Sequence, residues 1–309
     1  MPRSEKPTAN TGTRCRRSAG SWACTTPPSA ASSRGTREKE CGNTRPDPMR
    51  VLHLSDLHVG CGECGARWRD LTERLGRARE ALGDPVVVVT GDLVERATEE
   101  ALLWEAKAGM DRLRSAGYAV LVVPGNHDYG DALRASPEGQ AAFGRLFYPD
   151  GPEGFPRVDF VGEAVFVGLE SMAAELHWYD ALWANGELGR AQLERLEDVL
   201  GRPQVRSARH RVVYLHHHPF DPMGPLHELK DALGLARVLK ENGPLDALLF
   251  GHNHAGGAYA GVWGIPRCYD AGTSTRKEGQ PGPLRLMDLS EDPSWDVDVR
   301  SQLYPDEGI

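Results

Sequence analysis

Five short apolar segments of the chain each end in side chains that can bind a metal ion. In chain order these segments read HLSDLH, VVVVTGD, VLVVPGNHD, VVYLHHHP and DALLFGHNH. The polar residues at their ends are Asp56, His58, Asp92, Asn126, His127, Asp128, His216, His217, His218, His252 and His254. In open α/β sheets the carboxyl ends of the strands form the ligand crevice. We therefore expect the five strand ends to converge on one site.

Between these strand ends, apolar residues recur at helical spacing, so strands alternate with helices along the chain. This alternation predicts a layered α/β architecture. The spacing of apolar residues predicts helices at 66–82, 97–116, 131–147, 189–200 and 228–242. The stretch RVDFVGEAVFVGLE predicts a hairpin with a Gly-Glu turn. The tail from 257 to 300 is interpreted as a further group of mostly antiparallel strands.

The first 48 residues differ in composition from the rest of the chain. They hold nine Lys or Arg against four acidic residues and are rich in Ser, Thr, Gly and Pro. Such a segment cannot bury enough apolar surface to offset the entropy of ordering. We expect residues 1–48 to be a disordered basic leader, with Met49 as an alternative start, and residues 49–309 to form one folded domain.

Charge and cysteine content exclude several classes of protein. The formal net charge is -8, and the folded part is more acidic still, so no stable nucleic-acid partner is expected. No run approaches the roughly 18 apolar residues of a membrane span. Six scattered cysteines do not form a disulfide framework, which predicts a cytoplasmic protein. Cys61 and Cys64 are interpreted as two thiols in a Gly-rich loop.

The polar residues suit a pair of metal ions. Residues two apart on an extended segment point the same way, so Asp56 can face one point with His58, and His252 with His254. Imidazole, carboxylate and amide ligands without thiolate suit Mn, Fe or Zn. The candidate ligands are more numerous than one ion can bind while keeping a position open for substrate. We therefore predict two ions, divalent or of mixed valence. Such a pair can clamp a phosphoryl group, and hydrolysis of a phosphate ester is the expected reaction.

The motifs SDLHVG, GDLVE, GNHD, HHHP and GHNH resemble, in this order, the five motifs of the calcineurin-like metallophosphoesterase superfamily. The resemblance implies an α/β (α+β) fold with four layers, in which a two-sheet β sandwich is flanked by helices. It implies that one ion is held by Asp56, His58, Asp92 and His254, and the other by Asp92, Asn126, His217 and His252. Asp92 then bridges the two ions.

The resemblance also implies roles for two neighbours of these ligands. His127 would lie beside the phosphate and assist the leaving oxygen, while a hydroxide that bridges the ions attacks. Asp128 would orient the His127 ring, with a turn-capping role as the alternative.

Alternation leaves two choices among the three consecutive histidines. On a strand that ends at Pro219, His217 faces one side while His216 and His218 face the other. The resemblance selects His217, because the ligand histidine of the family usually stands two before the proline. If the strand ends early, His216 takes the role.

Formal charge favours a phosphodiester as substrate. Two divalent ions, two aspartates and one hydroxide leave one positive charge, which a singly charged diester neutralises. The stretches NGELGRAQLERLEDVL and YDAGTSTRK resemble bacterial class III cyclic-nucleotide phosphodiesterases. The expected partner is a small phosphate ester or nucleotide, on whose base Trp178, Tyr179 and Trp183 could stack. A phosphomonoesterase or protein phosphatase, and a non-catalytic scaffold, are the alternatives.

Overall fold

Continuous apolar runs place the strands of this chain in buried layers. In β2 (Val86–Thr90) every residue is buried. Val87 and Val89 pack with the side chains of helices, whereas Val86 and Val88 pack with those of a second sheet. This is the pattern of a parallel strand that is covered on both faces.

The computed structural model describes residues 48–131, 135–149, 154–172, 185–220, 229–275 and 282–305. Within the compact unit Pro46–Ile309 these residues form two mixed sheets. The first has the order β11-β10-β1-β2-β3, with β1 at Arg50–Leu54, β3 at Val120–Val123, β10 at Arg285–Asp288 and β11 at Val297–Asp298. The second has the order β4-β5-β6-β7-β9-β8, with β4 at Arg157–Val161, β5 at Ala164–Gly168, β6 at His210–Tyr214, β7 at Ala247–Phe250, β8 at Gly257–Ala258 and β9 at Arg267–Asp270.

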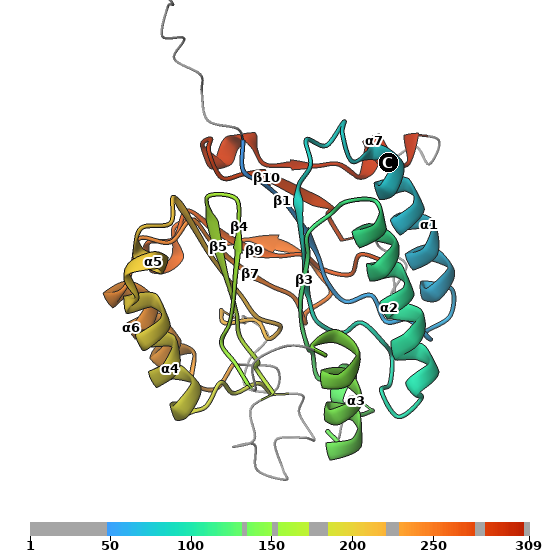
Figure 1. Cartoon of the computed structure of the whole chain (residues 1–309), viewed down its shortest axis with the longest axis horizontal. Helices are drawn as coiled ribbons and strands as arrows, with labels where there is room; N and C mark the ends of the chain where they lie inside the picture. Colours follow the sequence, from blue (N-terminus) through green and yellow to red (C-terminus); the bar gives the residue numbers. More distant parts are fainter. Residues whose placement is uncertain are drawn as a thin grey trace, which may run out of the picture. The chain divides into compact units, whose positions relative to one another are not determined.

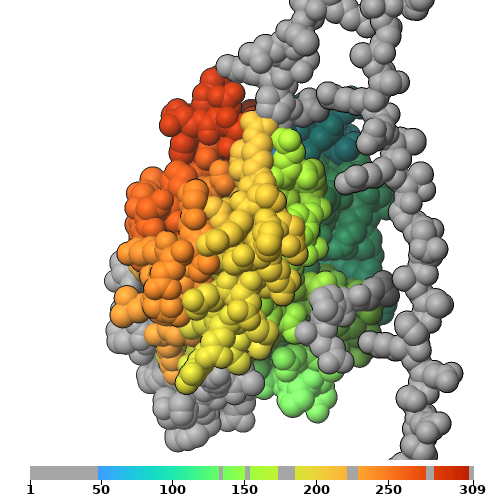
Figure 2. Space-filling model, turned by 60° about the vertical axis from the view of Figure 1, so that its left-hand side comes forward, coloured from blue at the N-terminus to red at the C-terminus, as the bar shows by residue number. Residues whose placement is uncertain are grey.

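Helices cover the outer face of each sheet, which gives four layers (Figure 1). The helices are α1 (Cys64–Ala78), α2 (Glu100–Ser115), α3 (Pro137–Phe147), α4 (Arg190–Gly201), α5 (Pro203–Arg206), α6 (Ala232–Glu241) and α7 (Arg300–Leu303). Helices α1 and α2 lie beside the first sheet, and α4 and α6 beside the second (Figure 1). In Figure 2 the yellow to orange atoms of the α4 to α6 region cover the outer side of the second sheet. The four-layer, two-sheet fold expected from the motifs is confirmed.

Most predicted elements are present with bounds shifted by a few residues. The expected hairpin is β4–β5, in which Val161 pairs with Ala164 across the Gly-Glu turn. The tail differs from its prediction, because it is divided between the two sheets. Strand β9 lies parallel to β7 in the second sheet, whereas β10 pairs antiparallel with β1 in the first. In the described part of the chain, no helix combines the length and the hydropathy that a membrane crossing requires.

The parallel strands bring the chemistry to one edge of the sandwich. Strands β1, β2 and β3 are mutually parallel, as are β5, β6, β7 and β9. Their carboxyl ends therefore lie at one edge of each sheet, where the polar segments of the sequence follow. Hydrogen bonds join these segments across the sheets. For example, Nδ1 of His216 lies 2.7 Å from the carbonyl oxygen of Thr90, and the amide of His252 donates to Asp56 Oδ2 at 3.2 Å.

A buried histidine in β1 makes stability depend on pH. Nε2 of His53 lies 3.0 Å from Oγ1 of Thr90, and the side chain is fully buried. Burial first, and then the charge of Arg285, lower the pKa of His53 from 6.5 to about 3. The histidine is therefore neutral in the folded protein at neutral pH.

We expect acid to destabilise the protein through His53. Below pH 6.5 the unfolded chain binds a proton that the folded chain does not bind, so stability is lost by about 1.4 kcal/mol per pH unit. His53→Gln cannot titrate, so between pH 7 and pH 5 it should lose about 2 kcal/mol less than the wild type. Urea unfolding of both metal-free proteins measures the difference, because their other titrating groups are the same. Equal losses would mean that His53 does not resist protonation in the folded state.

Candidate functional site

The ends of β1, β2 and β7 form a first group of ligand atoms. Nε2 of His58 lies 3.7 Å from Asp92 Oδ2 and 2.8 Å from Nε2 of His254. Nε2 of His254 in turn lies 3.3 Å from Asp56 Oδ1. One ligand atom from each of these four residues lies within 4.8 Å of the others. The structure thus brings together all four residues that the motifs assign to the first ion.

Asp92 also belongs to a second group. Its Oδ1 lies 3.5 Å from Nε2 of His216. The same His216 nitrogen lies 3.1 Å from Asn126 Oδ1 and 3.2 Å from Nδ1 of His252. The two carboxylate oxygens of Asp92 therefore face different groups, as a bridging ligand requires.

His217, the histidine expected as a ligand of the second ion, lies beside this group. Its ring centroid is 4.4 Å from that of His252, and its Nδ1 lies 2.7 Å from Oγ of Ser171. Among the described residues, the clusters of metal-capable side chains include His216 and not His217. The physical reason is that β6 ends at Tyr214, so strand alternation does not extend to the histidines. His218 packs against Phe250, with ring centroids 4.5 Å apart.

The backbone of the site is strained. Its left-handed φ angles are 51° at Asp56, 44° at His58, 50° at Asp92, 81° at His252 and 58° at His254. For a residue with a side chain this conformation costs about 1–2 kcal/mol. The expectation that Asp56 and His58 share a face of an extended segment was therefore wrong in its geometry. The two side chains meet because the backbone turns.

Glycines beside the ligands allow close approach of the chain. A Cβ on Gly125 would lie 2.2 Å from Oδ1 of Asp92, and a Cβ on Gly251 would lie 2.4 Å from Oδ2 of Asp56. Real Cβ atoms do not come this close to another heavy atom. Each position therefore excludes a side chain because a carboxylate occupies the space.

The proton positions of the rings fit a metal site. Nδ1 of His216 faces a carbonyl oxygen and donates to it, so in the neutral ring Nε2 carries the lone pair. That lone pair faces the oxygens of Asp92 and Asn126, which are acceptors as well. These acceptors repel one another unless a proton or a metal ion lies between them. Imidazole, carboxylate and amide donors suit Mn, Fe or Zn.

Both aspartates are ionised, as metal ligands must be. Burial raises the pKa of Asp92, but the imidazoles around it, first that of His216, outweigh burial and lower the pKa. Burial likewise raises the pKa of Asp56, and His254 outweighs it. The two carboxylates therefore supply fixed negative charge in a buried site.

His127 and Asp128 differ in surroundings. Nδ1 of His127 lies 2.7 Å from the carbonyl oxygen of Glu95, and its Nε2 lies 3.8 Å from Asp92 Oδ2. The Asp128 carboxylate instead accepts the amides of Leu93, Val94 and Gly125 at 2.8, 3.2 and 2.9 Å. The expected ring partner is thus replaced by a backbone carbonyl, and Asp128 caps the turns on either side.

Sequence reasoning missed Glu95. Its Oε2 lies 3.1 Å from Nδ1 of His58, while its carbonyl holds His127. These three residues form a third metal-capable group. The signal was present in GDLVE, where an acid stands three residues after Asp92, but only the fold places it at His58. A carboxylate on the outer nitrogen of a ligand histidine fixes the ring and raises its basicity.

We expect Glu95→Ala to weaken metal binding by about 10–100-fold, the usual effect of losing such a partner. Glu95→Gln should recover part of the loss, because its amide oxygen can still accept from His58. Competition with a chromophoric chelator measures the affinity for Mn²⁺. Glu99→Ala is the matched control, since Glu99 is 59% exposed and pairs with Arg96. If the alanine variants at positions 95 and 99 bind metal alike, Glu95 does not position His58.

Several residues named from the sequence lie outside the described residues. These are Trp178, Tyr179 and Trp183, the three aromatic residues that could stack on a nucleobase.

Comparisons with known proteins agree with this geometry. A family model described as calcineurin-like phosphoesterase matches residues 49–256. Curated protein sequences give no match. A purple acid phosphatase from yellow lupin (Lupinus luteus) superposes with a TM-score of 0.55 at 14% identity, over 82% of this chain and 48% of the lupin chain. A dimetal phosphatase from Danio rerio has a TM-score of 0.54 at 14% identity, over 79% of this chain and 93% of that chain.

The two structural likenesses concern the fold, and this chain spans about half the length of the lupin protein. The family match spans all five motif segments, the last of which is GHNH. Together with the buried groups of aspartate and histidine, it identifies a metal-dependent phosphoesterase. The chain belongs to the calcineurin-like phosphoesterase family.

Proposed function

We propose that this protein hydrolyses phosphodiesters with a pair of metal ions. Asp56, His58, Asp92 and His254 would hold one ion, and Asp92, Asn126, His216 and His252 the other. The donor set suits Mn, Fe or Zn. When bound, such a pair supplies charge that polarises the phosphoryl group and activates water.

The observation that carries the choice of a diester is the third carboxylate. Glu95 lies 3.1 Å from His58, beside the two aspartates. Two divalent ions, three carboxylates and one hydroxide leave no net charge, so a singly charged diester adds only one negative charge to the site. A dianionic monoester would add two negative charges, which the neutral site disfavours more. Arg96 is 55% exposed and pairs with Glu99, so it gives this site little compensation.

The chain's own residues then have separate tasks. Asp92 would hold the two ions together through its two oxygens. The carbonyl of Glu95 fixes the His127 ring with Nε2 directed towards Asp92. A substrate at that place would have its leaving oxygen within reach of Nε2, which can deliver a proton.

A panel of substrates with added Mn²⁺ tests the proposal. We expect kcat/KM for bis-p-nitrophenyl phosphate to exceed that for p-nitrophenyl phosphate by about tenfold or more. Cyclic AMP and a phosphopeptide extend the comparison to a nucleotide diester and to a protein phosphatase substrate. Glu95→Gln should narrow the ratio of diester to monoester, because it removes one negative charge. A monoester preference, or a ratio unchanged in Glu95→Gln, would contradict the charge argument.

A further inference from the structure

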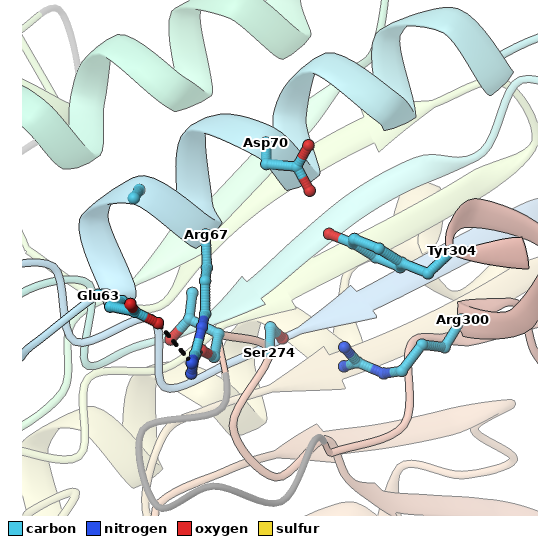
Figure 3. Close-up of a pocket in the computed structure, with 8 residues that line it drawn as sticks. Glu63, Arg67, Asp70, Ser274, Arg300 and Tyr304 are labelled. Atoms are coloured by element: carbon cyan, nitrogen blue, oxygen red, sulfur yellow. Dashed lines mark hydrogen bonds and ion pairs between the residues drawn. The ribbon is translucent and has the colours of Figure 1, made fainter. Parts of the chain in front are cut away.

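A cavity separate from the metal-binding groups lies beside α1. It has a volume of about 330 Å³ and is bordered by α1, by the C-terminal region around α7 and by the segment that follows β9 (Figure 3). The polar side chains that line it are Glu63, Arg67, Asp70, Ser274, Arg300 and Tyr304. None of these residues belongs to the metal-capable groups of the described chain.

Two guanidinium groups face this cavity, that of Arg300 buried and that of Arg67 partly exposed. Arg300 is only 3% exposed, and its Nε and Nη2 donate to the carbonyl of Gly282 at 3.1 and 2.5 Å. Figure 3 shows its guanidinium directed from the α7 side towards Ser274. Arg67 enters from α1, and its Nη1 donates to the carbonyl of Thr275 at 3.2 Å. Guanidinium groups that are already held in place bind an oxyanion with little further loss of entropy.

A hydroxyl group completes the donor side of the cavity. Oγ of Ser274 accepts the amide of Ser55 at 3.0 Å, so its own proton can be donated elsewhere. Arg67, Ser274 and Arg300 approach the cavity from three directions (Figure 3). Three donor groups in this arrangement match the three terminal oxygens of a phosphomonoester better than the two oxygens of a carboxylate.

The α1 side of the cavity supplies acceptors as well. Oε2 of Glu63 lies 2.8 Å from Nη2 of Arg67. The Asp70 carboxylate accepts Nε of Arg74 at 2.8 and 3.0 Å. These carboxylates are partly neutralised by arginines, yet they would still repel a bare dianion. A ligand with hydroxyl groups can donate to them while its anion contacts Arg300.

We propose that this cavity binds a small phosphomonoester that carries hydroxyl groups, of the size of glycerol 3-phosphate. Its phosphate lies among Arg67, Ser274 and Arg300, and its hydroxyl groups face Glu63 and Asp70. The site does not depend on the proposed diesterase activity. It is close to the metal-binding segment, because Ser274 bonds to Ser55, the residue before Asp56.

Calorimetric titration of the metal-free protein tests this site alone, since phosphate binding at the family's active site needs the ions. We expect one glycerol 3-phosphate per chain, with inorganic phosphate weaker and glycerol without measurable binding. Arg67→Met should weaken binding by about tenfold or more, because a charge-assisted hydrogen bond is lost. Arg69→Met is the matched control, since Arg69 is 53% exposed on the same helix and pairs with Glu105.

Ser274→Ala provides a second variant with little change in volume, and it should also weaken binding of glycerol 3-phosphate. Circular dichroism of each variant establishes that it is folded. The proposal is overturned if the wild type shows no saturable binding. It is also overturned if the methionine variants at positions 67 and 69 bind alike, or if glycerol 3-phosphate and inorganic phosphate bind equally.

Discussion

Replacing His127 with alanine should slow hydrolysis of a diester with a poor leaving group by about 10²–10⁴-fold, the usual contribution of a positioned general acid. The reason is that Nε2 of His127 is the nitrogen left to act, because its Nδ1 is held 2.7 Å from the carbonyl of Glu95. With bis-p-nitrophenyl phosphate, whose leaving group needs no proton, the loss should be much smaller. Steady-state rates with an alkyl diester and with the nitrophenyl diester, both with Mn²⁺, measure this difference.

Asn126→Ala is the contrasting variant. Oδ1 of Asn126 lies 3.1 Å from Nε2 of His216, within the second group of ligand atoms. Its loss should lower turnover of both diesters together and should reduce bound metal. His127→Ala should keep its metal content. Equal losses of His127→Ala on both diesters would show that the ring does not protonate the leaving oxygen.

His216→Ala should weaken binding of one of the two ions by more than about 100-fold. Loss of a residue that only hydrogen-bonds to a metal ligand usually costs about 10–100-fold in affinity, and a ligand itself should cost more. His216 places Nε2 at 3.5 Å from Asp92 and 3.1 Å from Asn126, so its loss leaves the second group incomplete. Turnover with Mn²⁺ at limiting concentration should fall with occupancy. Calorimetric titration with Mn²⁺ gives the number of ions and their affinities.

His217→Ala is the matched control for this prediction, since it removes the neighbouring ring from the same segment. Nδ1 of His217 lies 2.7 Å from Ser171, and its ring packs beside His252, so a modest effect on affinity is expected. Loss of one ion from His217→Ala together with retention in His216→Ala would reverse the assignment.

The ends of the strands explain why one sandwich can hold such a site. Asp92 follows β2 of the first sheet and His216 follows β6 of the second, and the two side chains contact each other. The second group therefore exists only when both sheets are packed together. Because metal binding would add ligand bonds across this interface, occupancy and the stability of the sandwich should be linked.

The sequence by itself determined the kinds of residue at each strand end and their order along the chain. Apolar runs such as VVVVT indicated buried parallel strands, and polar residues at their carboxyl ends have to meet at one edge of a sheet. This reasoning needs only periodicity and chain order. It predicted a layered α/β architecture with the polar strand ends at one site. The four layers and the grouping of Asp56, His58, Asp92 and His254 came from the resemblance of the motifs to the calcineurin-like family.

The tertiary structure alone decided which atoms meet within the loops. Strand alternation could not choose between His216 and His217, because β6 ends at Tyr214 and the following backbone is no longer extended. It could not assign the carbonyl of Glu95 to His127 or the Glu95 carboxylate to His58 either. Left-handed residues such as Asp92, with φ of 50°, turn the chain in directions that no periodic pattern encodes. Contacts after a strand ends depend on packing between the two sheets, which the sequence specifies only through the complete fold.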